Sequence, residues 1–335
     1  MKIITLITLT FLSLNSHAVV ETELNEKFHS EVLPFIFHHT KQKRFLSKDS
    51  KLKHKASIFY LSYKVQNPKG VIVLSPGRTQ SYANFYELFY DLRNEGYDIF
   101  AIDHIGQGHS QRLLTDVQKC HVKKFSQYLV HFERFMNKVI KVENYEKRIL
   151  IGHSMGGHIA THYAKTNPDR VHNLFLSAPM YDFPTGKYTK FQATQLSRIL
   201  VLLGQGNKYA PGKGPYDLNW QFEGNDSTNS KTRFEIQKYI RREYPMTQLG
   251  GPTARWVMTS IYANKALEKD IDRIYAKTTI FQAELDAVVL NPPQNQLCEK
   301  MRNCNLILMK GAKHSLLHGK DKTRNFIINK IKEVL

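Results

Sequence analysis

Apolar residues in this chain form short runs that alternate with segments of helical periodicity. The runs 70–74 (GVIVL) and 97–102 (YDIFAI) are rich in β-branched and aromatic side chains, and residues 84–94 between them have the spacing of an amphipathic helix. Short apolar strands that alternate with helices predict an α/β fold, with a mostly parallel sheet covered by helices on both faces. Further segments of these kinds predict strands at 58–65, 147–151, 171–176, 278–282 and 306–309, and helices at 125–142, 158–166 and 323–334.

The alternation stops between residue 178 and about residue 277. This stretch contains Gly-rich turns, many Tyr and Arg residues, and the apolar run ILVLL at 199–203. Because it separates two predicted strands, we expect a single domain at 19–335 with a helical cap insertion at about 180–275. The polar, Lys-rich stretch that precedes the first strand, up to about Lys55, is expected to pack loosely on the outside.

Residues 1–18 have the pattern of a secretory signal peptide. A Lys at position 2 is followed by an apolar run at 3–14 and by the small residues Ser16 and Ala18. The run is too short to span a bilayer. We therefore expect cleavage after Ala18, Val19 as the first residue of the mature chain, and a periplasmic or secreted protein. The alternative is association with a membrane through an uncleaved amino-terminal segment.

The chain is strongly basic, with 48 Lys and Arg against 29 Asp and Glu and a formal net charge of +19. Such a surface attracts polyanions, and it also favours solubility. The positive residues are spread along the sequence, and neither zinc-finger spacing nor an RNA-recognition signature is present. Nucleic acid is therefore not expected as a partner, whereas peripheral contact with an anionic membrane remains open.

Three cysteines are present, at positions 120, 298 and 304. An exported protein could pair Cys298 with Cys304 and leave Cys120 free, but the sequence does not decide whether the pair forms. No cysteine spacing is typical of a metal site, so no metal is expected.

The pentapeptide Gly152-His153-Ser154-Met155-Gly156 matches the G-x-S-x-G pattern of a nucleophile elbow. A predicted strand ends just before it and a predicted helix follows, which makes the match specific. In this context the serine lies on a tight strand-to-helix turn, and Gly152 and Gly156 avoid clashes that larger side chains would cause. The sequence therefore predicts Ser154 as a nucleophile.

A serine hydroxyl needs a base to accept its proton, and the order on this architecture is serine, acid, histidine. His314 follows the last predicted strand and is the preferred base, with His318 as its competitor. Asp286 follows the strand at 278–282 and is the preferred acid, with Glu284 as the alternative. The prediction is a Ser154, Asp286 and His314 triad at three strand ends.

Two backbone N–H groups are needed to stabilise the oxyanion that forms at the attacked carbonyl. One is expected from Met155, directly after the nucleophile. The other is expected from Arg78, in the turn that follows the strand at 70–74. The loop at 103–110 (DHIGQGHS) supplies glycines for a second tight turn close to the pocket.

The chain resembles α/β-hydrolases of the serine aminopeptidase S33-like, monoacylglycerol lipase and lysophospholipase branch, and is most similar to its bacterial lysophospholipases. The resemblance implies the same triad, a lysophospholipid or monoacylglycerol substrate, and no cofactor. It is weaker at Ile105, where many relatives have Arg, and at Ser75-Pro76, where monoacylglycerol lipases have His before the oxyanion glycine; the latter favours the lysophospholipases. The matching segments are 75–92, 103–114, 152–161, 250–257, 284–289 and 310–314.

The leading hypothesis is a lysophospholipase that releases a fatty acid through an acyl-enzyme. Three alternatives remain: a monoacylglycerol lipase or broad carboxylesterase, a lysophospholipid acyltransferase, and a non-catalytic lipid-binding protein that kept the fold. In the cap, Phe191, Leu196, Ile199 and Leu203 have helical spacing and are expected to line an acyl slot, contact a membrane, or form ordinary helix core.

Overall fold

The computed structural model describes residues 18–49 and 54–335, so the predicted signal peptide, apart from Ala18, lies outside the described residues. An eight-stranded sheet has the order β1-β2-β4-β3-β5-β6-β7-β8. The strands from β4 through β8 in this order run parallel, whereas β2 is antiparallel to both β1 and β4. The predicted mostly parallel sheet is confirmed. The strands are β1 (Thr40–Asp49), β2 (His54–Tyr63), β3 (Gly70–Ser75), β4 (Asp98–Ile102), β5 (Lys147–His153), β6 (Asn173–Ser177), β7 (Lys277–Ala283) and β8 (Cys304–Met309).

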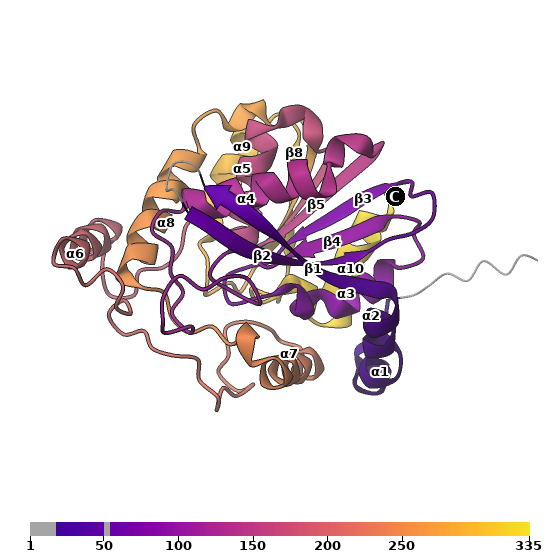
Figure 1. Ribbon diagram of the computed structural model, residues 1–335, viewed down its shortest axis with the longest axis horizontal. Helices are drawn as coiled ribbons and strands as arrows, with labels where there is room; N and C mark the ends of the chain where they lie inside the picture. The colour runs from indigo at the N-terminus through magenta and orange to yellow at the C-terminus, as the bar shows by residue number, and fades with distance from the viewer. Residues whose placement is uncertain (1–17, 50–53) are drawn as a thin grey trace, which may run out of the picture.

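Helices cover both faces of the sheet, as Figure 1 shows. On one face lie α3 (Tyr86–Leu92) and α10 (Asp321–Lys332), and on the other lie α4 (Ser126–Arg134), α5 (Met155–Thr166) and α9 (Asn291–Lys300). The helix predicted at 125–142 continues from α4 into a π-helical turn, and the helix predicted at 84–94 begins as a 3₁₀ turn. The short helices are η2 (Tyr82–Phe85), η3 (Phe135–Ile140), η4 (Val142–Asn144), η5 (Pro168–Arg170), η6 (Pro245–Thr247), η7 (Ile271–Arg273) and η8 (Leu316–His318).

The amino-terminal stretch is more ordered than its composition indicates, and the expectation of loose packing is wrong. It forms α1 (Glu21–Lys27), a π-helical turn η1 (Phe28–Val32), α2 (Leu33–His39) and strand β1. Leu24, Phe28, Val32 and Ile36 recur every fourth residue and are buried in the main core. This narrow apolar stripe anchors the helices to the domain although most of their surface is polar.

The insertion between β6 and β7 contains α6 (Lys190–Leu202), α7 (Lys231–Glu243) and α8 (Ala254–Leu267). Helix α6 packs against α8 and projects away from the sheet in Figure 1, whereas α7 packs against α1 and η2. Among the described residues, no helix is long and apolar enough to cross a membrane.

A disulfide bond joins Cys298 in α9 to Cys304 at the start of β8. The third cysteine, Cys120, is free and buried. The structure therefore contains the pairing that the sequence left open.

Candidate active site

Ser154 occupies a strained turn between the end of β5 and the start of α5. Its backbone has φ 53° and ψ −123°, a region that non-glycine residues rarely adopt. The flanking glycines make the turn possible: a Cβ added at Gly156 would lie 2.0 Å from the carbonyl oxygen of Ser75, and one at Gly152 would lie 2.7 Å from Cα of Gly157. The predicted steric reason for both glycines is thus present in the structure.

The three residues predicted as a triad lie within hydrogen-bonding distance of one another. The Ser154 hydroxyl donates to Nε2 of His314 at 2.9 Å, and Nδ1–H of His314 donates to Oδ2 of Asp286 at 2.8 Å. The Asp286 carboxylate is fully buried, and its other oxygen accepts the backbone N–H groups of Val288 and Val289 at 2.8 and 3.0 Å. This arrangement fixes the carboxylate, and through it the tautomer and orientation of the imidazole.

The two competing residues lie elsewhere. Glu284 is exposed and accepts the backbone N–H of Gly311 at 2.7 Å. His318 is buried and donates from Nε2 to the carbonyl of Asn84 at 2.7 Å. Burial lowers the pKa of His318 to about 4, which keeps this ring neutral at physiological pH. The geometry therefore favours Asp286 and His314, as the sequence reasoning did.

The turn after β3, which carries Arg78, approaches the nucleophile closely. A Cβ added at Gly77 would lie 3.1 Å from Cβ of Ser154, so only glycine fits without a local shift. Two glutamines hold the turn: Gly77 donates its N–H to Oε1 of Gln80 at 2.9 Å, and Nε2 of Gln107 donates to the carbonyls of Gly77 and Gln80 at 2.8 Å each. This turn therefore brings Gly77, which directly precedes Arg78, beside the elbow.

Sequence reasoning missed Gln80 and Gln107 as positioning residues. Gln107 lies in the loop 103–110, which follows β4, the neighbour of β3 in the sheet. The same loop is tied down by Asp103, whose carboxylate accepts the backbone N–H groups of Tyr82 and His109 at 2.7 Å each. The glycine-rich pattern marked a turn near the pocket, but it did not indicate which side chain contacts the turn 77–80, which we call the oxyanion turn because the sequence predicts Arg78 as an oxyanion donor.

Two further buried histidines lie near the triad. The ring centroid of His153 is 4.9 Å from that of His314, and its Nδ1–H donates to the carbonyl of Ser177 at 3.0 Å. Burial lowers the pKa of His153 well below its ordinary value, so this ring stays neutral. His104 hydrogen-bonds through Nε2 to the Ser75 hydroxyl at 3.0 Å, and burial lowers its pKa to about 3.

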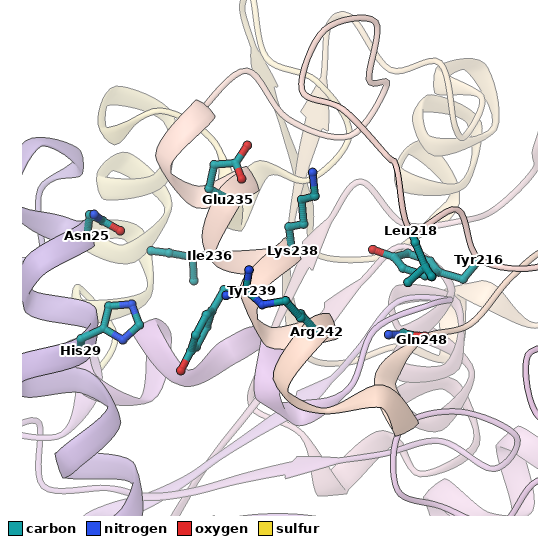
Figure 2. A pocket seen from close by; sticks show the side chains of 10 residues that line it. All are labelled: Asn25, His29, Tyr216, Leu218, Glu235, Ile236, Lys238, Tyr239, Arg242 and Gln248. Carbon is teal, nitrogen blue, oxygen red and sulfur yellow. The ribbon is translucent and has the colours of Figure 1, made fainter.

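A separate cavity of about 570 Å³ lies between the amino-terminal helices and α7 (Figure 2). His29 faces it from the amino-terminal side, while Glu235, Lys238 and Arg242 project from α7 and Tyr216 from the cap loop. None of the three triad residues lines this cavity. In the described part of the chain, no group of three His, Cys, Asp or Glu residues could hold a metal ion.

Comparisons with known proteins find similar sequences and similar folds. Residues 66–321 match the family described as serine aminopeptidase, S33. The chain is 33% identical over 265 residues to a probable lysophospholipase L2 of Haemophilus influenzae, covering 79% of this chain and 83% of the relative. It is 30% identical over 282 residues to lysophospholipase L2 of Escherichia coli K12, covering 81% of this chain and 82% of the relative. The fold is similar to that of a soluble variant of Saccharomyces cerevisiae monoglyceride lipase, with a TM-score of 0.68, 20% identity, and 88% and 94% of the two chains covered.

Proposed function

Because this chain belongs to the serine aminopeptidase S33 family of α/β-hydrolases, we propose that it hydrolyses the acyl ester of lysophospholipids and releases the fatty acid. It is an ester hydrolase, and the choice of lysophospholipid follows its two lysophospholipase L2 relatives, which match across four fifths of the chain. The observation that carries the proposal is the continuous hydrogen-bonded chain from Ser154 through His314 to Asp286.

In the proposed mechanism, Oγ of Ser154 attacks the ester carbonyl while Nε2 of His314 takes the hydroxyl proton. Asp286 stabilises the imidazolium that forms. The backbone N–H groups of Met155 and Arg78 stabilise the oxyanion, and each donor of this kind is worth about 3 kcal/mol in the transition state. His314 then returns the proton to the departing glycerol oxygen. A water molecule, activated by the same imidazole, attacks the acyl-enzyme and frees the fatty acid and Ser154.

We propose that helix α6 brings the enzyme to the membrane surface that holds its substrate. Phe191, Ile199, Leu202 and Leu203 are 71, 53, 83 and 67% exposed, so the apolar face of this helix points to solvent instead of lining an enclosed slot. Exposed apolar patches of this kind are typical of interaction surfaces. The net charge of +19 supports an anionic membrane as the partner.

We propose a periplasmic or secreted location, with cleavage after Ala18. The disulfide bond between Cys298 and Cys304 supports this location, because disulfides persist in oxidising compartments.

The experiment that tests the proposed reaction uses the purified protein and its Ser154→Ala variant. Both are incubated with a panel of lysophospholipids, monoacylglycerols, intact phospholipids and short esters, and the products are identified by mass spectrometry. We expect free fatty acid and glycerophosphodiester from lysophospholipids with the native protein only. Preferential hydrolysis of monoacylglycerols, a diacyl product, or full activity of Ser154→Ala would each contradict the proposal.

A further inference from the structure

A buried cluster of charged side chains joins α3, α7 and α10. Arg233 contacts Glu87 and Asp321, each at 2.9 Å, and Arg324 contacts Glu87 at 3.2 Å and Asp91 at 2.6 Å. The side chains of Arg233 and Arg324 are 1% exposed, and that of Asp91 is fully buried. The cluster is therefore largely shielded from water.

The cluster is one positive charge short. Three carboxylates, those of Glu87, Asp91 and Asp321, face two guanidinium groups, which leaves a net charge of −1. Within residues 18–49 and 54–335, the ion pairs of these carboxylates involve the two arginines only. An excess of buried negative charge is costly even when each carboxylate contacts an arginine, and burial raises the pKa of Asp91 above its ordinary value.

The backbone of Val19 lies in the middle of this cluster. Its nitrogen donates to Oδ1 of Asp91 at 3.1 Å, its carbonyl oxygen accepts from Nη2 of Arg233 at 3.1 Å, and the residue is 5% exposed. Two residues on, the nitrogen of Glu21 donates to Oδ2 of Asp321 at 2.8 Å. The first residues after the predicted cleavage site are thus fixed by the same acidic and basic groups.

We propose that cleavage after Ala18 converts the nitrogen of Val19 into the third cation of this cluster. Hydrolysis of the Ala18–Val19 peptide bond consumes one water, leaves a carboxylate on Ala18, and turns a neutral amide N–H into an ammonium group beside Asp91. Three cations then face three carboxylates, of which those of Glu87 and Asp91 are buried. The mature amino terminus is a buried ion-paired part of the fold, and the uncleaved precursor lacks this pairing.

The position of the cluster links this terminus to the candidate active site. Nε of Arg324 donates to the carbonyl of Leu317 at 3.1 Å, and Nη1 of Arg233 donates to the carbonyl of Gly319 at 2.9 Å. Both carbonyls belong to the segment directly after His314. The new ammonium group therefore pairs with the carboxylates of the same network of ion pairs whose arginines hold this segment, and that network reaches the cap through α7.

The first test identifies the amino terminus. The full-length chain is exported from a bacterial host, and mass spectrometry of the purified protein determines its first residue. We expect Val19. A terminus at any other residue, or an uncleaved chain, overturns the proposal.

The second test compares two chains made as cleavable fusions, one beginning at Val19 and one beginning at Ser16. The two chains differ only in the residues Ser16, His17 and Ala18 and in the position of the amino-terminal ammonium group. We expect the chain that begins at Val19 to melt about 3 °C or more above the longer one at pH 6. Asp91→Asn should lower the melting temperature more in the Val19 chain than in the longer chain. The control variant Glu95→Gln removes a carboxylate that pairs with Lys332 outside the cluster. It should lower the melting temperature by the same amount in both chains.

The pH dependence separates the ammonium from a mere change of length. An α-amino group titrates at about 7.7 to 8.0 when unpaired, and pairing with a buried carboxylate raises its folded-state pKa. The extra stability is therefore complete below about pH 7.7 and is lost as the pH rises through the folded-state pKa. The charged and titratable groups that face it are Glu87 and Asp91 of α3, Arg233 of α7, Asp321 and Arg324 of α10, the neutral His318 of η8, and Glu21 of α1, whose carboxylate accepts from Ser230.

Equal melting temperatures for the two chains at pH 6, or equal effects of Asp91→Asn in both, overturn the proposal. If the longer chain does not fold, the reactivity of the Val19 amine towards cyanate decides. We expect it to react at least tenfold more slowly than the same amine in Asp91→Asn, and equal rates overturn the proposal. None of these measurements uses ester hydrolysis, so their failure is distinct from failure of the proposed function.

Discussion

Replacing Gln107 by methionine tests whether this side chain holds the oxyanion turn. Gln107 is 1% exposed, and its Nε2 donates to the carbonyls of Gly77 and Gln80 at 2.8 Å each. Methionine has a similar length and an apolar end, so the volume is nearly kept while both hydrogen bonds are lost. The variant therefore removes the donor and little else.

The expected effects follow from these two bonds. The Gly77 carbonyl keeps the backbone N–H of Gln80 at 3.2 Å, so the main loss is the donor of the buried Gln80 carbonyl, which costs about 1 to 3 kcal/mol of folding free energy. Complete loss of one oxyanion donor lowers kcat by about 10² to 10³. Because the Arg78 N–H is displaced rather than removed, we expect kcat to fall about 10- to 100-fold. KM should change little, because these donors act mainly on the charge of the transition state.

The assay measures kcat and KM on a chromogenic short-chain ester and on a lysophospholipid, together with the melting temperature. Gln111→Met is the matched control, since Gln111 is an exposed residue of the same region whose Oε1 accepts the Ser57 N–H at 3.1 Å. We expect the control to keep native kcat. A Gln107→Met protein that is destabilised but has native kcat would refute the assignment of Gln107 to the turn.

Two further predictions concern the acid and the membrane-facing helix. Asp286→Asn should lower kcat about 10⁴-fold in the ester assay, because asparagine no longer favours the required tautomer of His314. The control Glu284→Gln should keep near-native kcat. Equal losses of kcat in the two variants would contradict Asp286 as the acid of the triad. Leu202→Glu should weaken sedimentation with anionic phospholipid vesicles about tenfold without lowering the melting temperature, because Leu202 is 83% exposed. The same substitution at Phe37, which is 63% exposed on α2, is the control, and an equal loss of binding there would contradict a role specific to α6.

The parts of the site that the sequence predicts are those whose chemistry is local. Ser154 follows from five consecutive residues that stand between a strand and a helix. Asp286 and His314 follow because parallel strands end at one edge of a sheet, so residues after successive strands converge there. Their neighbours Glu284 and His318 could be ranked below them from loop position, but only the coordinates separate them by their hydrogen bonds.

The parts that the sequence did not predict depend on partners far apart in the chain. Arg233 meets Glu87 across a separation of 146 residues, and no local pattern pairs them. The amino-terminal helices were missed because their apolar stripe is one residue wide and is surrounded by Lys, Glu and His. Strand β1 was missed for a related reason: it is an edge strand rich in lysine, a composition that discourages further pairing and hides the strand pattern.

The site consists of two halves that meet through the hydrogen bond between Ser154 and His314 and through the ring contact between His153 and His314. Ser154 and the oxyanion turn are held by β4, β3 and β5, which are neighbours in the sheet, while the acid and the base follow β7 and β8. Strand β6 lies between the halves and bonds to both at its end: Ser154 donates its N–H to the carbonyl of Ser177 at 3.0 Å, and Ala178 donates to the carbonyl of Phe281 at 2.8 Å. A shift of β6 against either neighbour would therefore change the distance from Ser154 to His314 while leaving each half intact. The reactive distance is set by the register of this central strand, which carries none of the reacting groups.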